Sequence, residues 1–164
     1  MVESGSDERY HLAQANLAEL RYPFGSPEMA DFEAALDTVN QLADTSPGFV
    51  WREEFDYRGG VRPIIFGRDD YLFTLSVWRD IESLHRFTYG GLHLGMFSQR
   101  LKWFVKDLRP TLVLWWIRPD HLPTVSEAES RLIHLREHGA TPFAFGFADR
   151  FEPSRSRSPL DVHE

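Results

Sequence analysis

The chain has no cysteine among its 164 residues. Disulfides, thiolate zinc sites, iron–sulfur clusters and thiol nucleophiles are therefore excluded. A chain without cysteine is compatible with a reducing compartment, so we expect a cytoplasmic protein.

Long apolar runs are also missing. The longest, such as residues 112–117, are far shorter than the roughly 20 apolar residues that a membrane-spanning helix needs. The N-terminus is polar and acidic and has no apolar signal core. We therefore expect a soluble protein that does not contact a membrane.

Positive charge is scarce: 18 lysine and arginine residues stand against 25 aspartate and glutamate residues, and the net charge is −7. Nucleic-acid-binding proteins normally have a basic surplus or stripe, so we expect no nucleic-acid partner. The sequence also has no HExxH zinc motif, no EF-hand loop, no glycine-rich phosphate loop and no Gly-x-Ser-x-Gly elbow. Hydrolytic and nucleotide-dependent reactions are therefore disfavoured, and the cofactor stays unknown.

The chain does have enough apolar material for one domain. Hydrophobic residues make up 42% of it and aromatic residues 14%, and a chain of this length buries about 70% of its unfolded surface. Residues 1–9 and 152–164 lack apolar periodicity, and we expect disordered tails there. Residues 10–151 are predicted to form a single domain.

The first half of the chain predicts a strand, a helix and a second strand. Residues 10–17 can form the first strand. Ser26 is a candidate N-cap, and Pro27 suits the first position of the helix that follows. Apolar residues then recur at helical spacing: Met29, Phe32, Leu36, Val39 and Leu42. The second strand is expected at residues 49–57.

The middle of the chain predicts one more strand and two helices. Residues 71–78 are rich in aromatic and β-branched side chains, as strands are. Asp80 can cap a short helix over residues 81–88. The glycine pair that follows should interrupt the helical pattern before a second helix over residues 92–105.

The last part of the chain completes the pattern. The apolar run at residues 111–117 is typical of a buried strand. Thr124 and Glu127 make a capping box for a helix that ends at His138, and a short aromatic strand is expected at residues 142–147. The order β-α-β-β-α-β with an extra αβ pair predicts an α+β protein with a ferredoxin-like split βαβ fold and an antiparallel sheet.

The segment 78–104 holds the most suggestive polar residues. Three groups that can transfer protons or bind ligands follow one another at four-residue steps: His85, Tyr89 and His93. Arg100 lies two helical turns after His93, with Phe97 between them. The spacing predicts a ligand pocket between the sheet and residues 81–105, with His93 and Arg100 on its wall.

Several stretches carry a family resemblance, and together they span nearly all of residues 10–150. They are residues 11–16, 29–32, 46–51 and 78–89, then His93, and then residues 100–104, 112–116 and 123–132. In these stretches the chain resembles the bacterial domain-of-unknown-function family numbered 3291. That family lies within the dimeric α/β-barrel group, which includes antibiotic-biosynthesis monooxygenase-like proteins.

The resemblance implies a ferredoxin-like unit that pairs its sheet with the sheet of a second copy. A homodimer is therefore expected, with a cavity between each sheet and its helices. Apolar strand residues on both faces, more than one helical layer can cover, point the same way. The wider group includes cofactor-free oxygenases, haem proteins and cyclases, so the fold does not fix the reaction.

Three residues are candidates for catalysis: His93 as a base or axial ligand, Tyr89 as a proton donor, and Arg100 as the partner of an anionic ligand. Each has a structural alternative, namely a histidine bonded to a carbonyl, a core tyrosine and an arginine paired with a carboxylate. Five more are candidates for substrate binding, with core or interface packing as the alternative: Gln14, Asn16, Phe97, Trp103 and Trp115.

Three functions compete at this point. The first is a monooxygenase-like protein, a cofactor-free oxidoreductase or isomerase that acts on an aromatic or polyketide-like ligand. The second is a non-catalytic protein that binds a hydrophobic ligand or stabilises a pathway enzyme. The third is a haem protein with His93 or His85 as axial ligand. The sequence leaves all three open.

Overall fold

The computed structural model describes residues 9–57 and 59–153. The tails predicted at residues 1–9 and 152–164 therefore lie largely outside the described residues, apart from Arg9, Glu152 and Pro153. Within the described residues, no helix has both the length and the apolar character that a membrane crossing needs.

Four antiparallel strands form one sheet in the order β2-β3-β1-β4. Their bounds are β1 His11–Glu19, β2 Phe49–Arg52, β3 Tyr71–Trp78 and β4 Leu112–Ile117. β1 and β3 are the central strands, and each pairs with a neighbour on both sides. Along the chain the elements of the sheet and its first helical layer follow the order β-α-β-β-α-β, with three short helices, α2 to α4, at the second α position. The predicted α+β class and ferredoxin-like split βαβ fold are confirmed.

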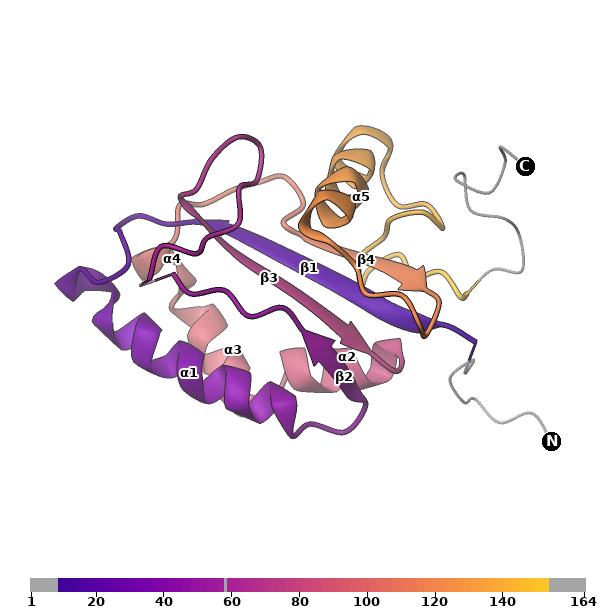
Figure 1. The fold of residues 1–164 in the computed structure, drawn as a ribbon, viewed down its shortest axis with the longest axis horizontal. Helices are drawn as coiled ribbons and strands as arrows, with labels where there is room; N and C mark the ends of the chain where they lie inside the picture. Colours follow the sequence, from indigo (N-terminus) through magenta and orange to yellow (C-terminus); the bar gives the residue numbers. More distant parts are fainter. Residues whose placement is uncertain (1–8, 58, 154–164) are drawn as a thin grey trace.

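The helices lie on both faces of this sheet (Figure 1). The 3-10 turn η1 (Pro27–Met29) leads into α1 (Ala30–Asp44), and α2 (Ile81–Thr88), α3 (Gly91–Ser98) and α4 (Arg100–Trp103) lie on the same side as α1. The last helix, α5 (Val125–His138), packs on the opposite face, above β4.

The face under α5 is buried within a single chain. Strand side chains on this face, such as Ala15, Leu75 and Trp115, pack against Leu132 of α5 and against Ile65 of the loop between β2 and β3. All five are at most 3% exposed. Both strand faces therefore need a covering layer, and on this face α5 and the loop provide the cover that was expected from a second copy.

The largest differences from the sequence-based bounds are in three places. β2 ends at Arg52 instead of residue 57. The helix expected over residues 92–105 is two short helices, because Gln99 leaves helical geometry (φ −104°, ψ 7°) and residues 103–105 pair with the end of β1. Residues 142–147 are no strand. They form a turn closed by a bridge between Thr141 and Ala144, and Phe145 makes a second isolated bridge with Leu114.

Side-chain caps explain where two helices begin. Asp80 accepts a hydrogen bond from the Ser83 amide at the start of α2, at 2.8 Å, and Thr124 accepts one from the Glu127 amide at the start of α5, at 3.1 Å. Both predicted caps are confirmed. Ser26 makes no cap, because its hydroxyl donates to the Pro23 carbonyl and η1 intervenes before α1.

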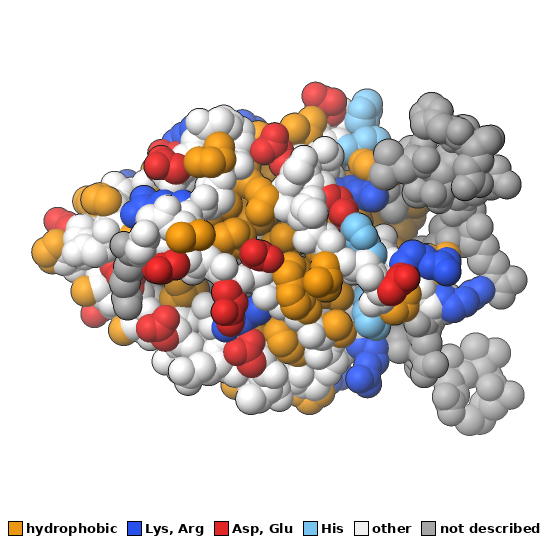
Figure 2. Space-filling view, in the orientation of Figure 1, with side chains coloured by type: hydrophobic (Ala, Val, Ile, Leu, Met, Phe, Trp, Pro, Cys, Tyr) orange, Lys and Arg blue, Asp and Glu red, His pale blue; other side chains and the backbone are white. Residues whose placement is uncertain are grey.

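Acidic side chains are scattered over the face shown in Figure 2, as the negative net charge leads one to expect. Several of the basic side chains are paired with them. Arg68, for example, contacts Glu19 at 2.8 Å and Asp70 at 2.6 Å. Exposed pairs of this kind contribute little to stability.

Candidate functional site

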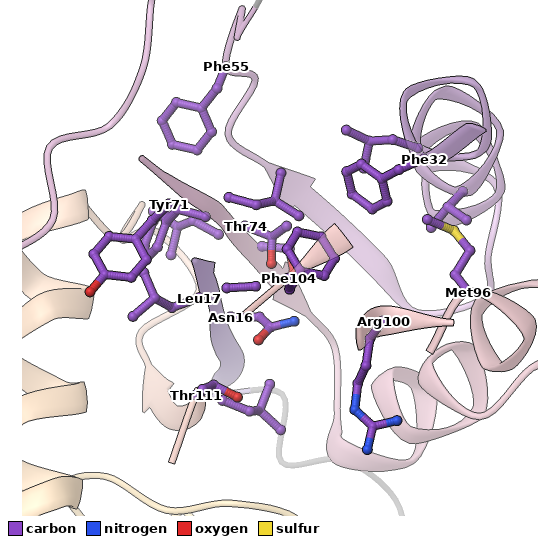
Figure 3. Close-up of a pocket in the computed structure, with 18 of the residues that line it drawn as sticks. Asn16, Leu17, Phe32, Phe55, Tyr71, Thr74, Met96, Arg100, Phe104 and Thr111 are labelled. Carbon is purple, nitrogen blue, oxygen red and sulfur yellow. The ribbon is translucent and has the colours of Figure 1, made fainter. Parts of the chain in front are cut away.

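A cavity of about 780 Å³ lies between the sheet and the helices α1 to α4. Its volume falls within the range of about 300–1,000 Å³ that is usual for small-molecule sites. Gln14, Asn16, Thr74 and Ser76 share one strand face, and the lining also includes Leu17, Phe73 and Leu75 of the alternate positions. Figure 3 shows part of the lining, which comes from the sheet, from α1 to α4, and from the segments that follow β2 and α4.

The floor carries a strip of neutral polar side chains. Gln14 on β1 donates through Nε2 to Ser76 Oγ at 2.9 Å and to Thr74 Oγ1 at 3.3 Å, both on β3. Trp78 donates through Nε1 to the same Ser76 oxygen, also at 2.9 Å. Asn16 lies directly across from Thr74 in the strand register. Among the described residues its side-chain amide has no hydrogen-bond partner, and Figure 3 shows it beside Thr74.

Aromatic rings form much of the wall above this strip. Phe32 of α1 is 3% exposed and meets Phe104 edge to face, with ring centroids 5.0 Å apart. Met96 of α3 packs with the same cluster. Figure 3 shows Phe32 and Met96 on the helical side and Phe55 across from them. A flat apolar ligand could therefore contact ring faces and edges on two sides.

Tyr57 closes the cavity next to the end of β2. Its hydroxyl accepts a hydrogen bond from the Phe73 amide and donates one to the Phe73 carbonyl, each at 2.8 Å. Its ring stacks on Phe24, with centroids 4.8 Å apart. Burial raises the pKa of the Tyr57 phenol to about 12, so this hydroxyl stays neutral and serves structure.

Charged side chains lie mostly toward the rim. Arg52 binds Asp44 through two hydrogen bonds, and this contact holds the pKa of the Asp44 carboxyl below its usual range. Glu33 is the buried exception, and its carboxylate accepts a hydrogen bond from the Gly25 amide at 2.8 Å. Within residues 9–57 and 59–153, no group of three or more His, Asp or Glu side chains is arranged to hold a metal ion.

The structure brings together three of the residues predicted from the sequence. Gln14, Asn16 and Arg100 all line the cavity. Arg100 is exposed, and its guanidinium points away from Asn16 and Thr74 in Figure 3, which places it at the rim. Trp103 is 5% exposed and packs behind the wall, against Phe32.

Two predicted residues lie elsewhere. Trp115 belongs to the face under α5, where its Nε1 donates to Glu127 at 2.8 Å, so it does not line the cavity. Tyr89 is 53% exposed and packs on His85 and Phe147 at the surface, and neither Tyr89 nor His85 lines the cavity. His85 and Tyr89 do contact each other, as their four-residue spacing predicts, but they do so outside the cavity, which corrects their expected place on its wall.

His93 and Phe97 cannot be placed in the same way. The backbone of both lies in α3, but their side chains are outside the described part of the structure. Their predicted roles as base and as apolar wall stay predictions.

Thr74 and Ser76 are site residues that sequence reasoning missed. The signal was available: in the run from Tyr71 to Trp78 they are the only two polar residues after the first position, and they are two apart. Residues two apart on a strand share a face, as Gln14 and Asn16 do on β1. What the sequence could not supply was the register that places the two pairs opposite each other.

Comparisons with known proteins identify a family and several solved structures of low sequence identity. Residues 11–161 match the family described as Domain of unknown function (DUF3291). No curated protein matches the chain. A conserved protein from Methanosarcina mazei Go1 is similar in structure, with 12% identity over 68% of this chain and 94% of that one, at a TM-score of 0.46.

Two further structures are similar to the same extent. SnoaB, a cofactor-independent oxygenase from Streptomyces nogalater, is 12% identical over 68% of this chain and 95% of its own, at a TM-score of 0.44. Rv0793 from Mycobacterium tuberculosis is 10% identical over 70% of this chain and 99% of its own, at a TM-score of 0.46. At such identities and TM-scores these likenesses assign no activity.

Proposed function

The chain belongs to the DUF3291 family, and we propose that it binds a flat, largely apolar small molecule in the cavity between its sheet and the helices α1 to α4. In this proposal the protein is monooxygenase-like and acts as a cofactor-free oxidoreductase or isomerase. The ligand is an aromatic or polyketide-like molecule that carries at least one oxygen.

The observation that carries the proposal is the pairing of aromatic walls with a polar floor. Apolar pockets with a few well-placed polar groups are the usual form of small-molecule sites. Phe32, Phe55 and Phe104 offer contact to rings, whereas Asn16 and Thr74 offer hydrogen bonds to an oxygen. A core built for packing alone gains nothing from polar side chains on this face, because their burial costs free energy.

Two of the chemical roles predicted from the sequence are kept in this proposal. His93 on α3 stays the proposed general base, and Arg100 at the rim stays the proposed partner of an anionic substituent on the ligand. Tyr89 is not assigned a role in the cavity, because it lies at the surface. The haem alternative would rest on His93, since His85 packs against Tyr89 and Phe147 instead of lining the cavity.

The homodimer also stays a prediction, but the surface through which two copies would pair differs from the one expected. The sheet face that a second copy was expected to cover is occupied by α5 and by the loop between β2 and β3. A second copy would therefore have to use another surface, such as the exposed edge at β2, where Val50 is 40% exposed. Light scattering checks this. A mass of 19.1 kDa, that of one chain, at micromolar concentration would contradict the dimer.

The binding proposal is tested by blocking the cavity. Ala18 lines the floor and is half-buried, whereas Ala34 of α1 is exposed and does not line the cavity. We expect Ala18→Phe to weaken the binding of anthraquinone, measured by quenching of tryptophan fluorescence, by at least about tenfold, or 1.4 kcal/mol. Ala34→Phe is the matched control and should bind as the wild type does.

Two results would count against the proposal. Equal binding by both variants would place the ligand elsewhere, and a wild type that binds neither anthraquinone nor its hydroxylated analogues would remove the cavity as a ligand site. Native mass spectrometry of the purified protein is an independent check, because a copurified aromatic ligand would appear as additional mass on the protein. An absorption spectrum with a Soret band would select the haem alternative.

A further inference from the structure

Four neutral polar side chains form two opposed pairs on one face of the central strands. Gln14 lies opposite Ser76 and Asn16 lies opposite Thr74 in the antiparallel register of β1 and β3. Directly opposed residues in such a ladder have Cβ atoms about 5 Å apart. The four side chains therefore make one continuous strip, and all four line the cavity.

The direction of the hydrogen bonds in this strip is the informative feature. Ser76 Oγ accepts from Gln14 Nε2 and from Trp78 Nε1, so both of its lone pairs are in use. Thr74 Oγ1 accepts from the same Gln14 nitrogen. Neither hydroxyl donates a hydrogen bond to any of the described residues. Both hydroxyl hydrogens are therefore left to donate to something in the cavity.

From this arrangement we propose that Ser76, Thr74 and Asn16 are a set of hydrogen-bond donors for the oxygen end of an enolate or phenolate ligand. The inference rests on the proposed function and deepens it, because it names the ligand class. Gln14 is a positioning residue here. By donating to both hydroxyls it orients their hydrogens away from itself and toward the ligand.

The surroundings favour this reading over a purely structural one. The helical side of the cavity, at Phe32 and Met96, is apolar, and a hydrogen bond to an anion is stronger where water is excluded. The titratable and charged groups on the cavity lining are mostly exposed or paired: Glu19, Glu33, Asp37, Arg52, Glu53, Asp56, Tyr57, Tyr71, Arg100, Lys106 and Asp107. The polar strip itself contains no carboxylate that would repel an anion.

The ligand class follows from the two halves of the site. Neutral donors that converge on one oxygen stabilise developing negative charge without the desolvation cost of a buried cation. Aromatic walls select a ring system or an extended conjugated chain. A phenol or an enolisable ketone of a fused-ring compound has both properties, and its ionisation releases one proton, which in an equilibrium measurement passes to the solvent.

The experiment measures the pKa of a bound phenol. Alizarin, a dihydroxyanthraquinone, changes its visible absorption when it ionises, and anthraquinone is its analogue without a hydroxyl. Each is titrated into the wild type and into Thr74→Val, Asn16→Leu and Thr88→Val. Thr88 lines the cavity from α2, outside the strip, so Thr88→Val is the matched control. Ser76→Ala is not used, because it would also remove the hydrogen-bond acceptor of Trp78 Nε1 and so change two interactions at once.

We expect the pKa of bound alizarin to be about one unit higher in Thr74→Val and in Asn16→Leu than in the wild type, since a hydrogen bond to a charged group is lost. Thr88→Val should leave this pKa unchanged. The carbonyl oxygens of anthraquinone accept only neutral hydrogen bonds, so its affinity should fall less in Thr74→Val and Asn16→Leu than the affinity for ionised alizarin. Bound alizarin with the same pKa in all four proteins would overturn the donor set while leaving the cavity as a binding site. Failure of both compounds to bind the wild type would overturn the proposed function and the inference with it.

Discussion

The Tyr57 hydroxyl satisfies both backbone groups of Phe73. It accepts from the amide and donates to the carbonyl, at 2.8 Å each. β2 pairs with β3 only as far as Arg52, and Glu53 adds one more backbone bond, to Leu75. Beyond that point a side chain provides the hydrogen bonds that a strand would otherwise provide, and Glu53, Phe55, Asp56 and Tyr57 line the cavity.

Removing this hydroxyl should therefore destabilise the fold. Tyr57→Phe keeps the ring stacked on Phe24 but leaves a buried amide and carbonyl without partners. We expect the free energy of unfolding to fall by about 1–3 kcal/mol, measured by urea denaturation. Tyr22→Phe is the control, because Tyr22 is 39% exposed. A loss no larger than that of the control would mean that water replaces the hydroxyl.

The same residue predicts how stability depends on alkaline pH. The pKa of Tyr57 is raised from 10.0 to about 12 by burial, so between these pH values the unfolded chain loses a proton that the folded chain keeps. Its contribution is fully present below pH 10 and is lost as the pH rises toward 12, by roughly 2–3 kcal/mol in all. Urea denaturation at pH 9 and pH 11 should show the loss in the wild type. Tyr57→Phe should lack this part of it.

The fold could be read from the sequence where local signals and tertiary contacts agree. Residues 71–78 and 81–88 were predicted with the bounds that β3 and α2 have, because a β-branched run and an Asp80 cap act locally. Residues 53–57 and 103–105 depend on distant partners. Tyr57 bonds to Phe73, and Val105 bonds to Glu19, and no local pattern encodes such a choice.

The candidate site could be predicted only in part for the same reason. Gln14 and Asn16 were found because polar residues on a predicted buried strand attract notice, and both line the cavity. Helical spacing correctly predicts that His85 and Tyr89 contact each other, at 4.5 Å between ring centroids, but it does not show whether their side of α2 faces the cavity. For Trp115, a candidate for substrate binding, alternation shows which residues share a face but not which layer covers it, and the structure places this side chain under α5.

Gly48, just before β2, is predicted to tolerate no side chain. Its φ of +85° is unfavourable for other residues, and a Cβ there would lie 2.1 Å from Ser83 Oγ and 2.4 Å from Ser83 Cβ. Gly25 also has a positive φ, of +91°, but has no heavy atom within 4 Å of the added Cβ. A substitution at Gly25 therefore measures the cost of the positive φ alone, without a steric clash.

We expect Gly25→Ala to lower the free energy of unfolding by about 1–2 kcal/mol, the cost of left-handed backbone for a residue with a Cβ. Gly48→Ala should lose a further 1–3 kcal/mol or so, because the clash must push α2 away from β2. Urea denaturation of both variants gives the comparison. Equal losses would show that α2 moves without cost, contrary to the tight contact between Gly48 and Ser83.

Glu127, in the first turn of α5, contacts the sheet and the loop that precedes the helix. Its Oε2 accepts from Trp115 Nε1 at 2.8 Å, its Oε1 lies 2.6 Å from His121 Nε2, and its amide binds the Thr124 cap. Trp115 is 0% exposed, whereas the His121 side chain is 46% exposed. The contact with Trp115 should therefore contribute most, since a buried donor cannot turn to water instead and an exposed ion pair contributes little.

Two substitutions separate these contributions. Glu127→Ala leaves the indole N–H unpaired and should lower the free energy of unfolding by about 1–3 kcal/mol. Glu127→Gln keeps a carbonyl oxygen for Trp115 and should recover most of that loss, although it removes the charge that faces His121. Glu137→Ala is the control, because the Glu137 side chain is 66% exposed and its one contact with His138 is 3.8 Å long. If Glu127→Gln is as unstable as Glu127→Ala, the charge that faces His121 contributes more than the hydrogen bond to Trp115, contrary to this prediction.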